Sequence, residues 1–240
     1  MNFATHVFDC DGVLLDSNRA KSEAFYRAAL PYGDDAARQL VAFHRTAGSI
    51  SRRERIEHFF TDILKREPDE GEVDAVVEAV DAGVREGVFN APKMPGVEQY
   101  LETVKGRKVV VSGVHKRELV SILEAQGLSE YFADVWGGPR RKSENLKRAI
   151  NAGVIELPAV YYGDTEDDCR AAGAAGLEFV YVFGGAETDG WADPSVRAVR
   201  DFTDLLPTPS KVRVGRDGYA DINGDRIYIG RRLAGAVVKV

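Results

Sequence analysis

A pair of acidic residues near the start of the chain has the types and the spacing that chemistry requires. Asp9 and Asp11 directly follow the apolar residues Val7 and Phe8, which predict a short buried strand, and Gly12 then permits a sharp turn. Open α/β sheets bind ligands in the crevice beyond the carboxyl ends of their strands. Two carboxylates at such an end can share a cation and divide two chemical roles. An ordinary acidic turn is the alternative, and Asp-x-Asp-Gly alone does not decide between the two.

Two further polar clusters occur where later strands are expected to end. Ser112 and Gly113 follow the apolar run 109–111, and Lys142 stands just before a predicted helix. A serine hydroxyl can hydrogen-bond an anion while the adjacent glycine lets backbone N–H groups approach it, and a lysine can neutralise a phosphate. The alternatives are a common helix-entry turn for the first pair and solvated surface for the lysine, and Arg141 competes with Lys142 for the same role.

A dense acidic segment follows the apolar run 160–162. Residues 163–168 read Gly-Asp-Thr-Glu-Asp-Asp at the start of a predicted helix. Capping and the helix dipole account for one or two acids in such a place, but not for four in five residues. Oxygen ligands of this kind suit Mg²⁺, which takes one or two carboxylates together with substrate phosphate. Asp164 and Asp168 therefore join Asp9 and Asp11 as candidate metal ligands.

The elements that carry these residues alternate between strand and helix after about residue 106. Strands are expected at 109–111, 131–136, 159–162 and 179–183, with helices between them, so the fold class is α/β with a Rossmann-like parallel sheet. Residues 17–92 instead have helical periodicity throughout and contain no predicted strand. Because the first strand precedes this block and the others follow it, we expect a helical cap inserted into the sheet domain.

The expected domains follow from these changes of pattern. Residues 1–16 and 93–207 form the Rossmann-like core, 17–92 the helical cap, and 208–240 a short C-terminal β appendage. Within the appendage, Asn223-Gly224 between two short strands is a strong hairpin signal. Its role, packing on the sheet edge or self-association, stays open.

Composition limits the classes of function. The chain has 240 residues and a net charge of −6, so it has no overall basic footprint for nucleic acid. No apolar run approaches the ~20 residues of a membrane span, and no leader pattern begins the chain. Cys10 and Cys169 are the only cysteines and fit buried thiols in a reducing compartment. We therefore expect a cytoplasmic protein, monomeric or homodimeric, that binds neither nucleic acid nor membrane.

Taken together, the four clusters resemble the four motifs of the haloacid dehalogenase superfamily, in that family's order, over roughly residues 3–206. The motifs are Asp9-x-Asp11, Ser112, Lys142, and Gly163-Asp164 with Asp168. The helical block resembles that family's cap, inserted between its first and second motifs. One departure is that Ser143 follows the lysine where proline often stands, which keeps Arg141 as a fallback.

The resemblance implies a phosphoryl-transfer mechanism. Asp9 would be the nucleophile that forms an aspartyl phosphate, and Asp11 the general acid and then the base. The carboxylates of Asp9 and Asp164 and the backbone carbonyl of Asp11 would hold Mg²⁺, with Asp168 close by. Ser112, Gly113 and Lys142 would hold the phosphoryl oxygens.

An acid at the second position also separates branches of the superfamily. Proteins that resemble dehalogenases or phosphonate-cleaving enzymes lack it, and ion-pumping ATPases carry threonine there, so Asp11 favours phosphate esters. The expected activity is a Mg²⁺-dependent phosphatase for a small phosphorylated metabolite, a sugar phosphate or a phosphoglycolate-like acid. A phosphosugar mutase resembling β-phosphoglucomutase is the alternative. A receiver-like signalling module and a non-catalytic binding protein fit the four motifs less well.

The cap is expected to choose the substrate. Arg52 and Arg53 begin a cap helix after a polar segment, and Lys21 lies one helix face above the acidic pair. Such cations can meet the anionic tail of a substrate. A capped and solvated helix is an equally good explanation of the two arginines. The physiological substrate itself stays open.

Overall fold

A computed structural model describes residues 2–47, 50–186, 193–207, 211–217, 219–222, 225–228, 232 and 235–239. They divide into two units, Met1–Leu205 and Leu206–Val240, each with its own internal contacts. Among the described residues, every helix is too short or too polar to cross a lipid bilayer.

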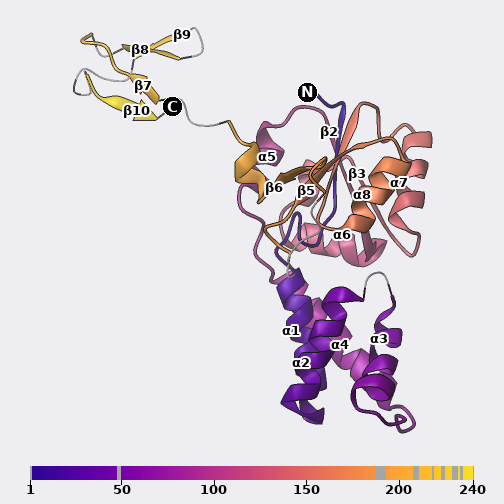
Figure 1. Ribbon diagram of the computed structural model, residues 1–240. Helices are drawn as coiled ribbons and strands as arrows, with labels where there is room; N and C mark the ends of the chain where they lie inside the picture. The colour runs from indigo at the N-terminus through magenta and orange to yellow at the C-terminus, as the bar shows by residue number, and fades with distance from the viewer. Residues whose placement is uncertain are drawn as a thin grey trace. The chain divides into compact units, whose positions relative to one another are not determined.

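The first unit is built on a parallel sheet whose strand order is β3-β2-β1-β4-β5-β6 (Figure 1). Its strands are β1 (Thr5–Phe8), β2 (Arg107–His115), β3 (Asp134–Gly138), β4 (Ala159–Gly163), β5 (Glu178–Val182) and β6 (Arg197–Val199). The first strand is central and pairs in parallel with β2 on one side and β4 on the other. The order therefore reverses at β1, and the crevice at such a reversal is where open α/β sheets bind ligands.

Helices cover the sheet, and the period of two along the strands decides which side chains meet them. The core helices are α5 (Val97–Thr103), α6 (Lys116–Ala125), α7 (Lys142–Asn151) and α8 (Glu166–Ala174). Val7, Val109 and Tyr161 belong to a buried cluster that includes Leu146 of α7 and Ala172 of α8. The intervening β1 and β4 residues, Phe8 and Tyr162, stack on each other and contact Tyr100 of α5 and Phe202. The predicted α/β class with a Rossmann-like sheet is confirmed.

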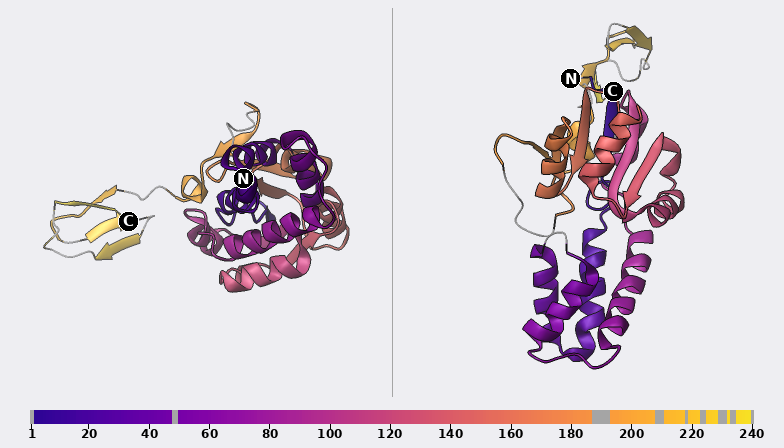
Figure 2. Two further views of the ribbon diagram at one scale, coloured as in Figure 1. Left: turned by 90° about the horizontal axis from the view of Figure 1, so that it is seen from below. Right: turned by 90° about the vertical axis from the view of Figure 1, so that its right-hand side faces the viewer.

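A helical block interrupts the sheet between β1 and β2, as expected. It consists of α1 (Asn18–Ala29), α2 (Asp34–Thr46), α3 (Arg52–His58), a π-helical turn at Phe59–Ile63, and α4 (Glu72–Phe89), and Figure 2 shows these helices gathered together. α1 and α4 pack closely, and Gly83 and Gly87 face Ala24 and Ala20. That this block is a domain separate from the core, with boundaries at residues 17 and 92, stays a prediction.

The second unit is a small antiparallel β structure. β7 (Lys211–Arg213) pairs with β10 (Val237–Lys239), and β8 (Tyr219–Ile222) pairs with β9 (Asp225–Tyr228). The β8–β9 pairing has the register of the predicted hairpin, while Asn223 and Gly224 themselves lie outside the described residues.

Two local expectations were wrong, and two elements were not expected. Strand β2 does not end at Val111 but continues to His115, so Ser112 and Gly113 lie within it. The extra length is possible because Val111 pairs with Trp136 and His115 with Gly138, which leaves two more residues on β2 than on β3, a bulge. The strand expected at 131–136 runs over Asp134–Gly138, and α5 and β6 were not expected at all.

Candidate active site

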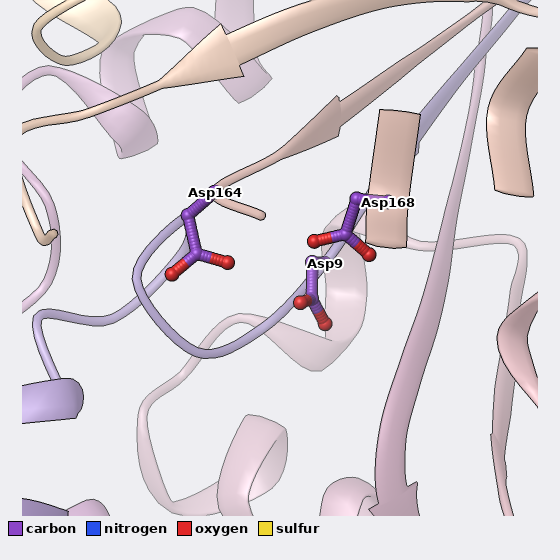
Figure 3. A group of neighbouring side chains, drawn as sticks. All are labelled: Asp9, Asp164 and Asp168. Carbon is purple, nitrogen blue, oxygen red and sulfur yellow. The ribbon is translucent and has the colours of Figure 1, made fainter. Parts of the chain in front are cut away.

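Three carboxylates from two segments meet at the carboxyl end of the central strands. Asp9 follows β1, Asp164 follows β4, and Asp168 lies in the first turn of α8, and one oxygen of each lies within 4.8 Å of the others (Figure 3). Thr165 caps that helix: its hydroxyl accepts from the Asp168 backbone N–H and donates to the Asp168 carboxylate at 2.6 Å. The hydroxyl of Thr165 therefore fixes the side chain of Asp168, which is fully buried.

Lys142 inserts its ammonium group between two of these acids. From the start of α7 its Nζ lies 2.5 Å from Asp9 Oδ2 and 2.7 Å from Asp168 Oδ1. Burial by itself lowers the pKa of this lysine, but the charges of Asp168 and Asp9 outweigh it and raise the pKa well above its ordinary value. Lys142 therefore stays charged. Arg141, the expected competitor, is the exposed residue just before the helix, and no interaction joins it to the three acids among the contacts described.

One lysine does not balance three carboxylates. Burial is the largest influence on both Asp9 and Asp164, and with the charges of the neighbouring acids it raises the pKa of Asp9 and brings that of Asp164 to about 7. A divalent cation would relieve this excess of negative charge. The ligands on offer are all oxygens, which is the donor set that Mg²⁺ prefers. The residues present therefore fit the ion that the sequence suggests.

Asp11 has a different environment although it lies only two residues from Asp9. Its carboxylate accepts from Ser17 Oγ at 2.5 Å and forms an ion pair with Lys21 Nζ at 2.5 Å. Burial favours the neutral acid, but the charge and hydrogen bond of Lys21, with the hydrogen bond of Ser17, outweigh it and lower the pKa of Asp11. The described acidic cluster does not include the Asp11 side chain. Any part of Asp11 in metal binding would thus fall to its backbone carbonyl.

The second expected motif lies beside the lysine. Ser112 is buried and its Oγ accepts weakly from the Val114 backbone N–H at 3.4 Å. A Cβ on Gly113 would lie 3.9 Å from the Lys142 side chain, so these two residues are neighbours. Because β2 bulges between Val111 and His115, the backbone of this segment is not paired residue by residue with β3. The position suits an anion that also contacts the lysine.

The two cap arginines form ion pairs with acids of α4. Arg52 contacts Asp81 at 2.5 Å, and Arg53 contacts Asp74. These pairs account for both side chains as surface structure, and their contact with a substrate stays a prediction. Lys21 differs because its ammonium group reaches Asp11.

Sequence reasoning missed several residues that contact the acids. Ser17 and Asn18, at the start of α1, hydrogen-bond Asp11 and Asp164. The signal was available, because a helix that begins directly after the acidic turn must bring its first turn close to it. Tyr161 gave no signal: it lies on the buried strand β4 like a core residue, yet its hydroxyl lies 3.2 Å from Asp168 Oδ1 and 2.9 Å from the Val111 carbonyl.

The fold and the site define an α/β protein with an acidic, lysine-bridged cluster at the reversal point of a parallel sheet. The model of the family described as haloacid dehalogenase-like hydrolase matches residues 3–176, which is more than half of the chain. The chain therefore belongs to the haloacid dehalogenase-like hydrolases and is an enzyme of the hydrolase class. The resemblance stated from the motifs is confirmed.

Individual relatives agree with the family. A phosphorylated carbohydrates phosphatase from Thermotoga maritima is 27% identical over 186 residues, which cover 73% of this chain and 82% of the relative. A solved structure described as a predicted phosphoglycolate phosphatase from Haemophilus somnus has a TM-score of 0.67 at 19% identity, covering 86% of this chain and 97% of that chain. A subfamily IA hydrolase of the superfamily from Geobacter sulfurreducens has a TM-score of 0.59 at 23% identity, with coverages of 85% and 96%. At these identities the two structures support the fold.

Proposed function

We propose that the protein is a Mg²⁺-dependent phosphatase that hydrolyses a small phosphorylated metabolite through an aspartyl-phosphate intermediate. The observation that carries the proposal is the contact of Lys142 with both Asp9 and Asp168, beside Asp164, at the carboxyl ends of β1 and β4. A nucleophilic carboxylate, a fixed cation for phosphoryl oxygens and an oxygen-rich metal site are the groups that this chemistry needs.

Asp9 is the nucleophile in this proposal. Its Oδ1 accepts the Cys10 backbone N–H at 2.7 Å, which holds the carboxylate in one orientation, and its Oδ2 faces Lys142. A carboxylate oxygen attacks phosphorus, a new P–O bond forms, and the bond to the substrate's ester oxygen breaks. Lys142 then pairs with phosphoryl oxygens, and Ser112 supplies a hydroxyl donor to them.

Asp11 handles the proton. In its protonated form it gives a proton to the departing alcohol in the first step. In the second step the resulting carboxylate takes a proton from the attacking water, and the bond between phosphorus and the Asp9 oxygen breaks, which releases inorganic phosphate and regenerates Asp9. The proton taken from water is then the one given to the next alcohol. The contacts with Lys21 and Ser17 stabilise the ionised form of its carboxylate. That is the form required of the base in the second step.

Mg²⁺ would be held by the carboxylates of Asp9 and Asp164 and the carbonyl of Asp11, with Asp168 beside them. When bound, it would offset the negative charge gathered where the phosphoryl group is transferred. The convergence of the Asp9, Asp164 and Asp168 carboxylates within 4.8 Å supports this assignment, because Lys142 alone does not balance their three charges.

The substrate class follows from the relatives rather than from the site. A phosphorylated carbohydrate is supported by the Thermotoga maritima relative, which is named for such substrates. A phosphoglycolate-like acid is supported by the Haemophilus somnus structure. The phosphosugar mutase alternative would use the same groups but return the phosphoryl group to the product, and the relative named as a phosphatase favours hydrolysis over it.

The test is phosphate release by the Asp9→Asn variant. The amide cannot form the acyl phosphate, so release from an aryl phosphate with Mg²⁺ present should fall by at least about a thousandfold. Asp167→Asn is the matched control, since Asp167 is exposed in the same acidic segment and pairs with Arg170. Asp9→Asn turnover close to that of the unchanged protein would defeat the mechanism. A panel of phosphorylated sugars and acids then identifies the substrate, and bisphosphate-dependent isomerisation without phosphate release would favour the mutase.

A further inference from the structure

We propose that Asn18, the first residue of α1, is a positioning residue that fixes the Asp164 carboxylate for a divalent cation. The proposal deepens the proposed function and rests on its metal site. It concerns a residue outside the four motifs, on the first turn of the helical block.

The hydrogen bonds of Asn18 are specific to an amide. Its Nδ2 lies 2.8 Å from Asp164 Oδ2 and 3.2 Å from the backbone carbonyl oxygen of Gly185. Both partners are acceptors, so the NH₂ end of the amide must face them, and its two hydrogens match the two acceptors. A carboxylate or an aliphatic side chain of the same size could not make this pair of bonds.

The backbone closes tightly around this pair. A Cβ added to Gly12 would overlap Asp164 Oδ2 and lie 2.5 Å from Asn18 Nδ2, and a Cβ on Gly185 would lie 2.9 Å from the Gly12 Cα. Glycine at these two positions lets the turn after β1 and the segment after β5 approach each other. The Asn18 amide donates to Asp164 at the end of β4 and to Gly185, so it links the segment after β1, the end of β4 and the segment after β5.

A carboxylate held in this way is prepared for a cation before the cation arrives. The Asn18 amide donates to one oxygen of the Asp164 carboxylate, which lies in the same cluster as the carboxylates of Asp9 and Asp168. The same bond restricts rotation of the carboxylate. Partners of this kind behind metal ligands typically contribute 10–100-fold in metal affinity. Asn18 also begins α1, so the metal site depends on how the helical block is seated.

The experiment compares Mg²⁺ binding by the unchanged protein and the Asn18→Leu variant without substrate. Leucine keeps the branching of asparagine at Cγ but is larger and donates no hydrogen bond. After chelator treatment, the unfolding temperature is followed as Mg²⁺ is added, because a ligand of the folded state raises it. We expect the half-saturating Mg²⁺ concentration to rise about 10–100-fold. Asn90→Leu is the matched control, since Asn90 is exposed at the end of α4 and its side chain donates to the Glu86 carbonyl, away from the acidic cluster.

The outcomes separate this proposal from the one on which it rests. An Asn18→Leu midpoint equal to that of Asn90→Leu overturns the positioning role, and Asn18→Ala repeats the measurement if the leucine variant does not fold. Loss of Mg²⁺ binding in Asp164→Ala verifies that the titration reports the proposed site. Absence of a Mg²⁺-dependent shift in the unchanged protein overturns the positioning role together with the metal site, while the Asp9→Asn assay reports on the nucleophile independently. At saturating Mg²⁺, the Asn18→Leu variant should regain most of the turnover of the unchanged protein. A general loss of structure would not allow this recovery.

Discussion

Asp9 and Asp11 lie two residues apart, and their surroundings shift their pKa values in opposite directions. Burial and the charges of Asp168 and Asp11 raise the pKa of Asp9. For Asp11 the charge and hydrogen bond of Lys21 and the hydrogen bond of Ser17 together outweigh burial and lower the pKa. A pair of acids whose environments separate their pKa values can divide two roles. With Lys21 in contact, Asp11 is ionised and ready to act as a base, and it can act as an acid only after it gains a proton.

This asymmetry predicts the behaviour of the Asp11→Asn variant. A nitrophenolate leaving group needs no proton from Asp11, so Asp9 can still take the phosphoryl group from nitrophenyl phosphate, but water is no longer activated in the second step. We expect a burst of about one nitrophenolate per active site, followed by turnover at least about a hundredfold slower than that of the unchanged protein. Rapid-mixing absorbance measures the burst. Asp9→Asn should give none, and an Asp11→Asn variant without a burst would contradict the separation of roles.

At the scale of elements, two features of the sequence allowed prediction: the spacing of apolar residues, and the polar residues that follow apolar runs. The alternation of strand and helix patterns predicted the parallel sheet. The polar clusters expected at its strand ends include Asp9, Lys142, Asp164 and Asp168, and these four side chains lie together in the structure. The end of β2 was missed because a bulge is set by pairing with β3, which no pattern along one strand reveals.

Side-chain partners were the other limit of the sequence. The cations at the start of α3 looked available to a substrate because the acids of α4 that pair with Arg52 and Arg53 are more than 20 residues away. Asn18 was missed for the same reason, since its partners Asp164 and Gly185 come from the other end of the sheet domain. Helical period locates a residue on a face, but it does not identify what that face meets.

The packing of α1 on α4 gives a prediction in which one substitution has opposite effects at two sites. Gly87→Ala would place a Cβ 2.8 Å from the Ala20 Cβ, whereas Gly173→Ala in α8 meets nothing within 4 Å. Both changes favour the helix, which should stabilise Gly173→Ala by about 0.5–1 kcal/mol. Overpacking costs about 1–3 kcal/mol, so Gly87→Ala should be net destabilised. Urea unfolding of the two variants measures the difference, and equal stabilisation of both would refute the close α1–α4 contact.

At the scale of the whole molecule, buried ionisable groups make stability depend on pH. His6 on β1 is 4% exposed, stacks on Tyr162 and lies 3.1 Å from its hydroxyl. Burial, and then the charge of Lys108, lowers its pKa to about 4. Asp164 acts in the opposite sense, because its pKa of about 7 lets the folded protein take up a proton before the unfolded chain does. The two groups therefore oppose each other as the pH falls below neutrality.

The contribution of His6 can be isolated by removing only that histidine. Between pH 6.5, the ordinary histidine pKa, and about 4, the unfolded chain binds a proton at His6 that the folded protein does not. The stability that His6 contributes is therefore complete above pH 6.5 and is lost as the pH falls through this window, by up to about 1.4 kcal/mol per pH unit. His6→Gln keeps a polar side chain without this titration, so its free energy of unfolding should fall less than that of the unchanged protein between pH 7.5 and pH 5.

Urea unfolding at the two pH values tests the prediction, and because Asp164 is common to both proteins its opposing effect cancels in the difference. Parallel pH dependences would mean that His6 can be protonated inside the folded core.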